Sequence, residues 1–136
     1  MQPARTVLTY GRFDGWNQAH VAFLRQLAQM GREVIVGCAT DAHAAAVGTP
    51  CRTPYAQRRA LLERCRYVTR VVPETSPGQK RTDIVNYNVS LLVMGDDHRG
   101  SLDHLQDIAK VCYLPAFPEV YAEFSGNWEW RAVVAG

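Results

Sequence analysis

The chain has 136 residues, of which 47% are hydrophobic and 21% are charged, and its net charge is +2. Such a composition is typical of one globular domain that buries a core without metal or disulfide support. The net charge is too small to indicate a nucleic-acid-binding protein, and no apolar run has the length of a membrane span. We therefore expect neither nucleic acid nor membrane as a partner.

The four cysteines, Cys38, Cys51, Cys65 and Cys112, lie far apart and form no Cys-x-x-Cys pair. Residues Met1 to Arg5 are not followed by a long apolar run, so we expect no signal peptide. Isolated thiols in such a chain are typical of a reducing compartment, so we expect a cytoplasmic protein.

Apolar strand-like runs alternate with helical patterns along the first half of the chain. In order, these are a strand at 6–10, a helix with apolar residues from Val21 to Ala28, a strand at 34–36, a helix with Thr53 as N-cap and Pro54 as first residue, and a strand at 68–72. The second half continues with a loop at 73–78, a short helix at 81–87, a strand at 91–94, a helix at 102–109 and a strand at 111–114.

This alternation predicts an α/β domain with a doubly wound, five-stranded parallel sheet that is covered on both faces. With strand order 3-2-1-4-5, the first and fourth strands are neighbours at the switch point, where ligands bind beyond the carboxyl ends of the strands. The loops at 11–20 and 95–99 fall there. We assign residues 1–115 to this domain and residues 116–136 to an aromatic-rich tail, with a hairpin at 121–131 that packs on the domain or on a second copy.

The loop before the first predicted helix combines several groups that suit an anion. Arg12 and His20 supply donors, and the helix N-terminus supplies backbone N–H groups. The alternative is purely structural, with Asn17 as a helix cap and His20 as a solvated first-turn residue.

Six segments in register resemble the glycerol-3-phosphate cytidylyltransferases, a branch of the HxGH nucleotidyltransferases with a Rossmann-like fold. They are Thr9–Asp14, Thr40–Asp41, Tyr55–Arg59, Arg66–Val68, Val93–Asp97 and Tyr113–Pro115. The resemblance implies a homodimer that joins CTP and glycerol-3-phosphate into CDP-glycerol and pyrophosphate, with Mg²⁺ accompanying the nucleotide.

The resemblance also implies roles for individual residues. The catalytic positions are His20 and Asn17, and Lys80 contacts the phosphorylated substrate. Nucleotide and phosphate binding falls to Gly11, Arg12, Phe13, Asp14, Ala19, Arg58, Arg66, Asp96 and Asp97.

Several of these assignments have a structural alternative. Arg58 and Arg59 also fit a solvated helix face, Lys80 fits an exposed loop lysine, and Asp96 and Asp97 fit a turn. A metal site formed by Asp96, Asp97, His98, Asp103 and His104 lacks a recognised ligand spacing, and we predict no resident metal.

Several family positions have lost their chemistry. The first histidine of the HxGH motif is Asn17 and its glycine is Ala19. Two loop lysines are replaced by Val47 and Thr49, and the arginine after the last strand is Ala116. Arg52 lies close to the lysine-free loop and is either a partial substitute or a solvated residue.

Because missing donors to a transferring phosphoryl group cost orders of magnitude in rate, we expect the ancestral activity to be lost or altered. The open alternatives are a catalytically dead relative that binds a nucleotide or a partner, an enzyme repurposed for another anionic small molecule, and the family reaction rescued by Arg12, Arg52 or the tail.

Overall fold

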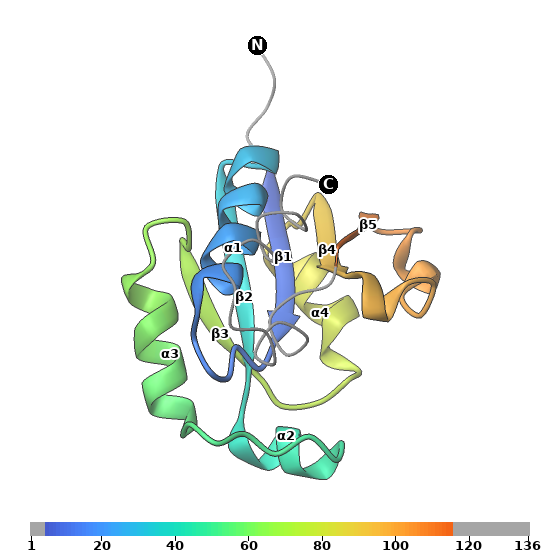
Figure 1. The fold of residues 1–136 in the computed structure, drawn as a ribbon. Helices are drawn as coiled ribbons and strands as arrows, with labels where there is room; N and C mark the ends of the chain where they lie inside the picture. The colour runs from blue at the N-terminus through green and yellow to red at the C-terminus, as the bar shows by residue number, and fades with distance from the viewer. Residues whose placement is uncertain (1–4, 116–136) are drawn as a thin grey trace.

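The computed structural model describes residues 5–115, except for the side chain of Asp97. Five parallel strands form one sheet in the order β3-β2-β1-β4-β5 (Figure 1), which confirms the predicted fold. The strands are β1 (Thr6–Gly11), β2 (Glu33–Ala39), β3 (Arg70–Glu74), β4 (Leu91–Gly95) and β5 (Lys110–Leu114). The helices are α1 (Gln18–Met30), α2 (Asp41–Ala46), α3 (Tyr55–Arg64) and α4 (Gln79–Asn86), with 3₁₀ turns η1 (Asp96–His98) and η2 (Asp103–Leu105).

The sheet has an apolar core on each face. Successive residues of β1 point to opposite faces, so that Val7 packs with α1 and α3 while Leu8 packs with α4. On the α1 side, Phe23, Leu24 and Leu27 fill the core. The apolar runs of the sequence are therefore explained by burial on both sides of a parallel sheet.

The predicted helix at 102–109 is wrong, because this segment forms turns and the short η2. Its amides bond mostly three residues back, as Leu105 N does to Leu102 O at 3.0 Å and Ile108 N to Leu105 O at 3.1 Å, and only Ala109 N bonds four residues back, to Leu105 O at 3.2 Å. Apolar residues spaced by three fit a 3₁₀ turn as well as an α-helix. The Tyr113 hydroxyl holds the turn by accepting from Leu102 N at 3.1 Å.

Three further expectations near β2 and β3 need correction. The segment after β2, predicted as loop, contains α2, which Thr40 caps by accepting from His43 N at 3.2 Å. Helix α3 begins at Tyr55 with Pro54 as N-cap, and Thr53 does not cap it. The third strand begins at Arg70 rather than 68, because Val68 N closes a turn to Cys65 O at 3.1 Å.

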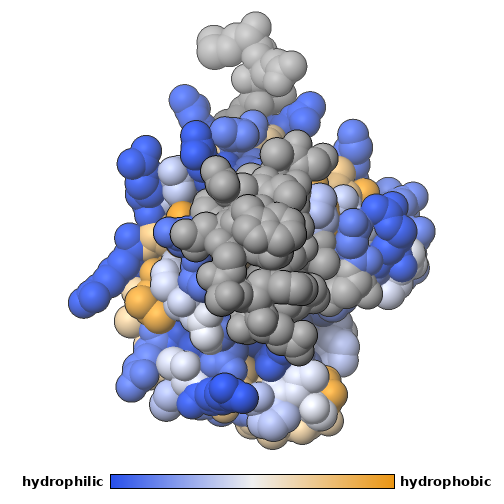
Figure 2. All heavy atoms as spheres, viewed as in Figure 1, coloured by the Kyte–Doolittle hydropathy of each residue, from blue (hydrophilic) through white to orange (hydrophobic). Residues whose placement is uncertain are grey.

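The surface of the described residues is mostly hydrophilic in the view of Figure 2, with isolated hydrophobic residues. Across residues 5–115, no helix combines the length and the apolar character that crossing a membrane requires. The predicted tail hairpin lies outside the described residues.

Candidate functional site

The loop after β1 leads directly into α1 at the predicted switch point, because β1 and β4 are neighbours in the sheet (Figure 1). Two other polar segments follow the carboxyl ends of strands nearby. One is the segment from Thr40 to Pro54 after β2, and the other is η1 after β4. The two loops that the sequence placed at the switch point thus lie at the carboxyl ends of neighbouring strands, as predicted.

Asn17 caps α1 with its own side chain. Its Oδ1 accepts from Ala19 N at 2.8 Å, and its Nδ2 donates to Gly15 O at 3.0 Å. Its backbone N–H donates to His20 Nδ1 at 3.1 Å, which completes a reciprocal cap. In this conformation the Asn17 amide serves the loop and the helix terminus.

His20 is fully buried, so the interpretation as a solvated first-turn residue is wrong. Its ring stacks on Trp16 with centroids 5.4 Å apart and lies 5.5 Å from the Phe13 ring. Burial lowers the pKa of His20 to about 4, against the opposing attraction of Asp14. Because Nδ1 accepts a hydrogen bond, the neutral ring carries its proton on Nε2.

Gly11 and Phe13 shape the start of the loop. Phe13 has a positive φ of 53° although it is only 2% exposed. A Cβ on Gly11 would lie 2.9 Å from the Phe13 ring, so glycine permits this close approach. Both residues therefore position the loop against His20.

Asp14 ties the β1 loop to the segment before α3. Its two carboxylate oxygens accept from Arg52 N at 2.8 Å and from Thr53 N at 3.0 Å. Burial raises the pKa of Asp14, but these amides and the charge of Arg12 outweigh it and lower the pKa overall. Arg12 contacts the same segment before α3, because its Nη1 donates to Thr49 O at 3.4 Å.

Arg58 is 1% exposed, so the solvated-face interpretation is wrong for this residue. Its guanidinium donates to Thr53 O, Arg12 O and Asp41 Oδ1, each at 2.8 Å. These bonds join the β1 loop, the N-terminus of α2 and the N-terminus of α3. Arg59 next to it is partly exposed and pairs with Glu63 at 3.1 Å.

Arg66 and Asp96 lie at opposite ends of the sheet. Asp96 follows the carboxyl end of β4 and pairs with Arg99 at 2.6 Å. Arg66 lies in the turn before β3, over the Tyr67 ring at 5.1 Å. Because α3 carries the chain back to the amino-terminal end of β3, Arg66 is not brought to the β1 loop within one chain.

Lys80 belongs to a second polar group, which we call the Glu74 cluster. Its members come from four elements and are Tyr10, His43, Glu74, Lys80 and Asp83. Lys80 Nζ lies 3.2 Å from Glu74 Oε2 and 4.7 Å from the centre of the Tyr10 ring. The Lys80 side chain is 13% exposed and lies in the first turn of α4, so its interpretation as an exposed loop lysine is wrong.

Tyr10 anchors one side of this cluster. Its hydroxyl donates to Asp83 Oδ2 at 2.7 Å, and burial followed by Asp83 raises the pKa of Tyr10 well above its ordinary value. A Cβ on Gly37 would collide with the Tyr10 ring, so the neighbouring strand leaves room for it. Sequence reasoning missed Tyr10, His43 and Glu74, although a glutamate that ends a buried strand is a usable signal.

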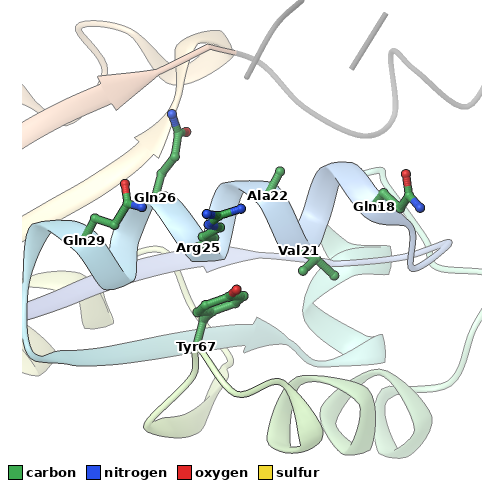
Figure 3. Close-up of a pocket in the computed structure, with 7 residues that line it drawn as sticks. All are labelled: Gln18, Val21, Ala22, Arg25, Gln26, Gln29 and Tyr67. Carbon is green, nitrogen blue, oxygen red and sulfur yellow. The ribbon is translucent and has the colours of Figure 1, made fainter. Parts of the chain in front are cut away.

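No group of three or more histidine, cysteine, aspartate or glutamate side chains within the described residues is arranged to hold a metal ion. A groove of about 400 Å³ runs along the outer face of α1 (Figure 3), lined by Gln18, Val21, Ala22, Arg25, Gln26, Gln29 and Tyr67. This groove faces away from the sheet and contains neither His20 nor Lys80, so we do not assign the site to it.

The chain matches known proteins over most of its length. A family model described as cytidylyltransferase-like matches residues 8–118. Two proteins named glycerol-3-phosphate cytidylyltransferase are 37% identical to it. The protein from Bacillus subtilis (strain 168) aligns over 111 residues, which cover 82% of this chain and 86% of the relative. The protein from Staphylococcus aureus (strain NCTC 8325 / PS 47) aligns over 110 residues, which cover 81% of this chain and 83% of the relative.

A solved structure supports the fold alone. It is described as the lipopolysaccharide core biosynthesis protein from Thermoplasma volcanium GSS1. The TM-score is 0.74 at 20% identity, with 85% of this chain and 100% of the other covered.

Proposed function

Since the chain belongs to the cytidylyltransferase-like family, we propose that it binds CTP and glycerol-3-phosphate at the carboxyl edge of the sheet but transfers the cytidylyl group poorly. We expect transfer at least about 10³-fold slower than in an ordinary member of the family, or none. The binding part follows from the loop, the α1 terminus and the Glu74 cluster. The loss of rate follows from the lack of positive charge in the Asn17–His20 motif.

The observation that carries this proposal is that the motif is neutral at pH 7. Asn17 has no ionisable group, and its amide is held by Ala19 N and Gly15 O. His20 is buried, with its pKa lowered to about 4, so it offers a neutral Nε2–H donor. A neutral donor holds a phosphate but stabilises developing charge less than a cation does.

The reaction itself defines where charge is needed. The acceptor hydroxyl oxygen forms a bond to the α-phosphorus of CTP, the bond from that phosphorus to the bridging oxygen of the β-phosphate breaks, and pyrophosphate leaves. The hydroxyl proton passes to solvent. Negative charge grows on the α-phosphate oxygens and on pyrophosphate, and His20 and Arg12 are the groups that we assign to meet it.

Other predicted residues act by positioning or binding. Gly11, Phe13 and Arg58 hold the β1 loop, and Ala19 places a methyl group in the first turn of α1. Asp96 and Asp97, after β4, are assigned to the nucleotide, as is Arg66 once a second copy is present. We also propose that the protein is a homodimer, because the aromatic rings of the tail need covering. We propose a cytoplasmic location because its cysteines are isolated.

Mg²⁺ would accompany CTP rather than occupy a protein cage. Both carboxylate oxygens of Asp14 accept hydrogen bonds from backbone amides, and Asp96 pairs with Arg99, so these carboxylates are already engaged. Oxygen ligands from the triphosphate itself suit Mg²⁺, which keeps several waters and uses few protein carboxylates. The ion would neutralise part of the triphosphate charge.

The test combines binding with turnover. Thermal unfolding is measured with CTP, ATP and glycerol-3-phosphate, each with Mg²⁺, and pyrophosphate release is measured beside the Bacillus subtilis relative. We expect CTP and glycerol-3-phosphate to raise the midpoint, with turnover at least about 10³-fold below the relative. Turnover on the order of 1 s⁻¹ would overturn the loss of rate, and an unchanged midpoint with CTP would overturn the binding.

A further inference from the structure

The Glu74 cluster brings two side-chain nitrogens near one carboxylate oxygen, and the nearer of them, Lys80 Nζ, donates a hydrogen bond to it. Lys80 Nζ lies 3.2 Å and His43 Nε2 3.8 Å from Glu74 Oε2. The three side chains are between 10% and 13% exposed. In such an enclosed place, electrostatic interactions are stronger than on an open surface.

The formal charge of the cluster is not positive before any ligand binds, because Lys80 faces two carboxylates, Glu74 and Asp83. Lys80 and Glu74 cancel, and Asp83 accepts from the Tyr10 hydroxyl at 2.7 Å and from Gln79 at 2.9 Å. Asp41, on the same helix as His43, is turned to Arg58 and is exposed. Lys80 alone therefore leaves no net positive charge for a phosphate, and a second donor is needed.

The cluster also offers an acceptor. Glu74 Oε2 accepts from Lys80 Nζ and lies 3.8 Å from His43 Nε2, whereas no donor among the described residues is in hydrogen-bond contact with Glu74 Oε1. A carboxylate oxygen of this kind accepts from a hydroxyl group. Donors for an anion beside an acceptor for a hydroxyl match a phosphorylated alcohol better than a simple anion.

We propose that His43 is a specificity-determining residue for the acceptor. Its Nε2–H and the Lys80 ammonium together bind the phosphate of a phosphorylated alcohol, while Glu74 accepts a hydroxyl of the same molecule. This inference rests on the proposed function only in that the acceptor binds at this edge of the sheet. It does not require that cytidylyl transfer takes place.

The experiment measures binding without CTP, so that slow or absent transfer does not affect it. Calorimetry gives Kd for glycerol-3-phosphate, glycerol and inorganic phosphate with the full chain, His43→Phe and His43→Gln. Phe removes the nitrogen donor, while Gln retains an amide N–H. The matched control is His104→Phe, since His104 is an exposed histidine on η2.

We expect His43→Phe to weaken glycerol-3-phosphate about ten-fold, the usual effect of losing one hydrogen bond to a charged group. His43→Gln should recover part of that loss, and Kd for CTP should stay within about two-fold in both variants. The unaltered chain should bind glycerol-3-phosphate more tightly than glycerol or inorganic phosphate.

Two results would overturn the proposal: an unchanged Kd for glycerol-3-phosphate in His43→Phe, or no binding of this ligand by the unaltered chain. An equal loss in His104→Phe would count against it as well. If His43→Phe does not fold, His43→Asn takes its place with the same expected loss, because its shorter amide does not reach the cluster. The pyrophosphate assay separately tests transfer, so the two failures are distinguishable.

Discussion

The loop that leads into α1 and the Glu74 cluster both lie at the carboxyl edge of the sheet, yet they differ in charge. The loop presents a neutral histidine and an asparagine whose amide caps its own helix. The cluster presents a lysine, a glutamate and a histidine in close contact. The two regions therefore differ in what they offer a ligand. The loop offers neutral donors that suit a phosphate, whereas the cluster offers a charged donor and a carboxylate acceptor that suit a phosphorylated alcohol.

On the function proposed above, this difference separates binding from catalysis. Rate depends on groups that interact more strongly with the transition state than with the substrate, and cations at the transferring phosphate are such groups. Binding depends on donors and acceptors that are present in the ground state. A protein can lose the first set at one loop and keep the second set a few residues away.

The largest expected effect comes from breaking the link between the two regions. Arg58 bonds Arg12 O in the loop and Asp41 at the start of α2, the helix that carries His43. Replacing Arg58 with Met leaves those oxygens without their buried donor, and we expect a loss of about 3 kcal/mol in the free energy of unfolding. Urea unfolding of the unaltered chain and of Arg58→Met measures this difference in the free energy of unfolding.

The matched control for this change is Arg59→Met on the same helix. Arg59 also donates, to Glu63, Tyr55 Oη and Val71 O, but it is partly exposed, so water can replace these partners and its loss should cost about 1 kcal/mol, less than that of Arg58. Equal destabilisation by both variants would show that Arg58 is not the link.

The next effect concerns pH and sharpens the description of the Asn17–His20 motif as neutral. The folded pKa of His20 is lowered to about 4 from an ordinary 6.5, so the unfolded chain binds its proton first as pH falls. Neutral His20 therefore contributes to the free energy of unfolding fully above about pH 6.5, and this contribution is lost as pH falls towards 4. The loss between pH 7 and pH 5 is about 2 kcal/mol.

Urea unfolding at the two pH values should show this loss in the unaltered chain and in His104→Asn. In His20→Asn, the pH-dependent difference should shrink by about 2 kcal/mol, whatever the absolute stability of the variant. The same pH dependence in His20→Asn would mean that other groups cause it.

The sequence was sufficient to predict the sheet, because its signal is strong. Runs such as Val34–Val36 and Leu91–Met94 are apolar on both faces, which a parallel sheet between two helical layers requires. The alternation of elements then places the polar loops at the switch point. Spacing alone did not separate the η2 turn from a helix, since Leu102, Leu105 and Ile108 fit both.

The arrangement of side chains was harder to predict from the sequence. Arg58 beside Arg59 is typical of a solvated helix, and its burial depends on carbonyl groups from distant loops. The contact of His43 with Glu74 depends on α2, which was predicted as a loop. Tertiary placement decides these features, and no local pattern encodes it.

The smallest expected effect is on rate and comes from restoring the motif in the double variant Asn17→His, Ala19→Gly. We expect pyrophosphate release to rise less than about ten-fold, because one donor is only part of a group that acts as a unit. Val47, Thr49 and Ala116 still stand where the resemblance implies cations. The new histidine also replaces a side chain that caps α1, and loss of an N-cap costs about 1 kcal/mol. Pyrophosphate release with CTP, Mg²⁺ and glycerol-3-phosphate measures the rate, and unfolding of the same sample measures the cap. A gain of 10³-fold or more would place the whole defect in the loop, whereas a small gain with unchanged glycerol-3-phosphate affinity would keep binding and transfer separate.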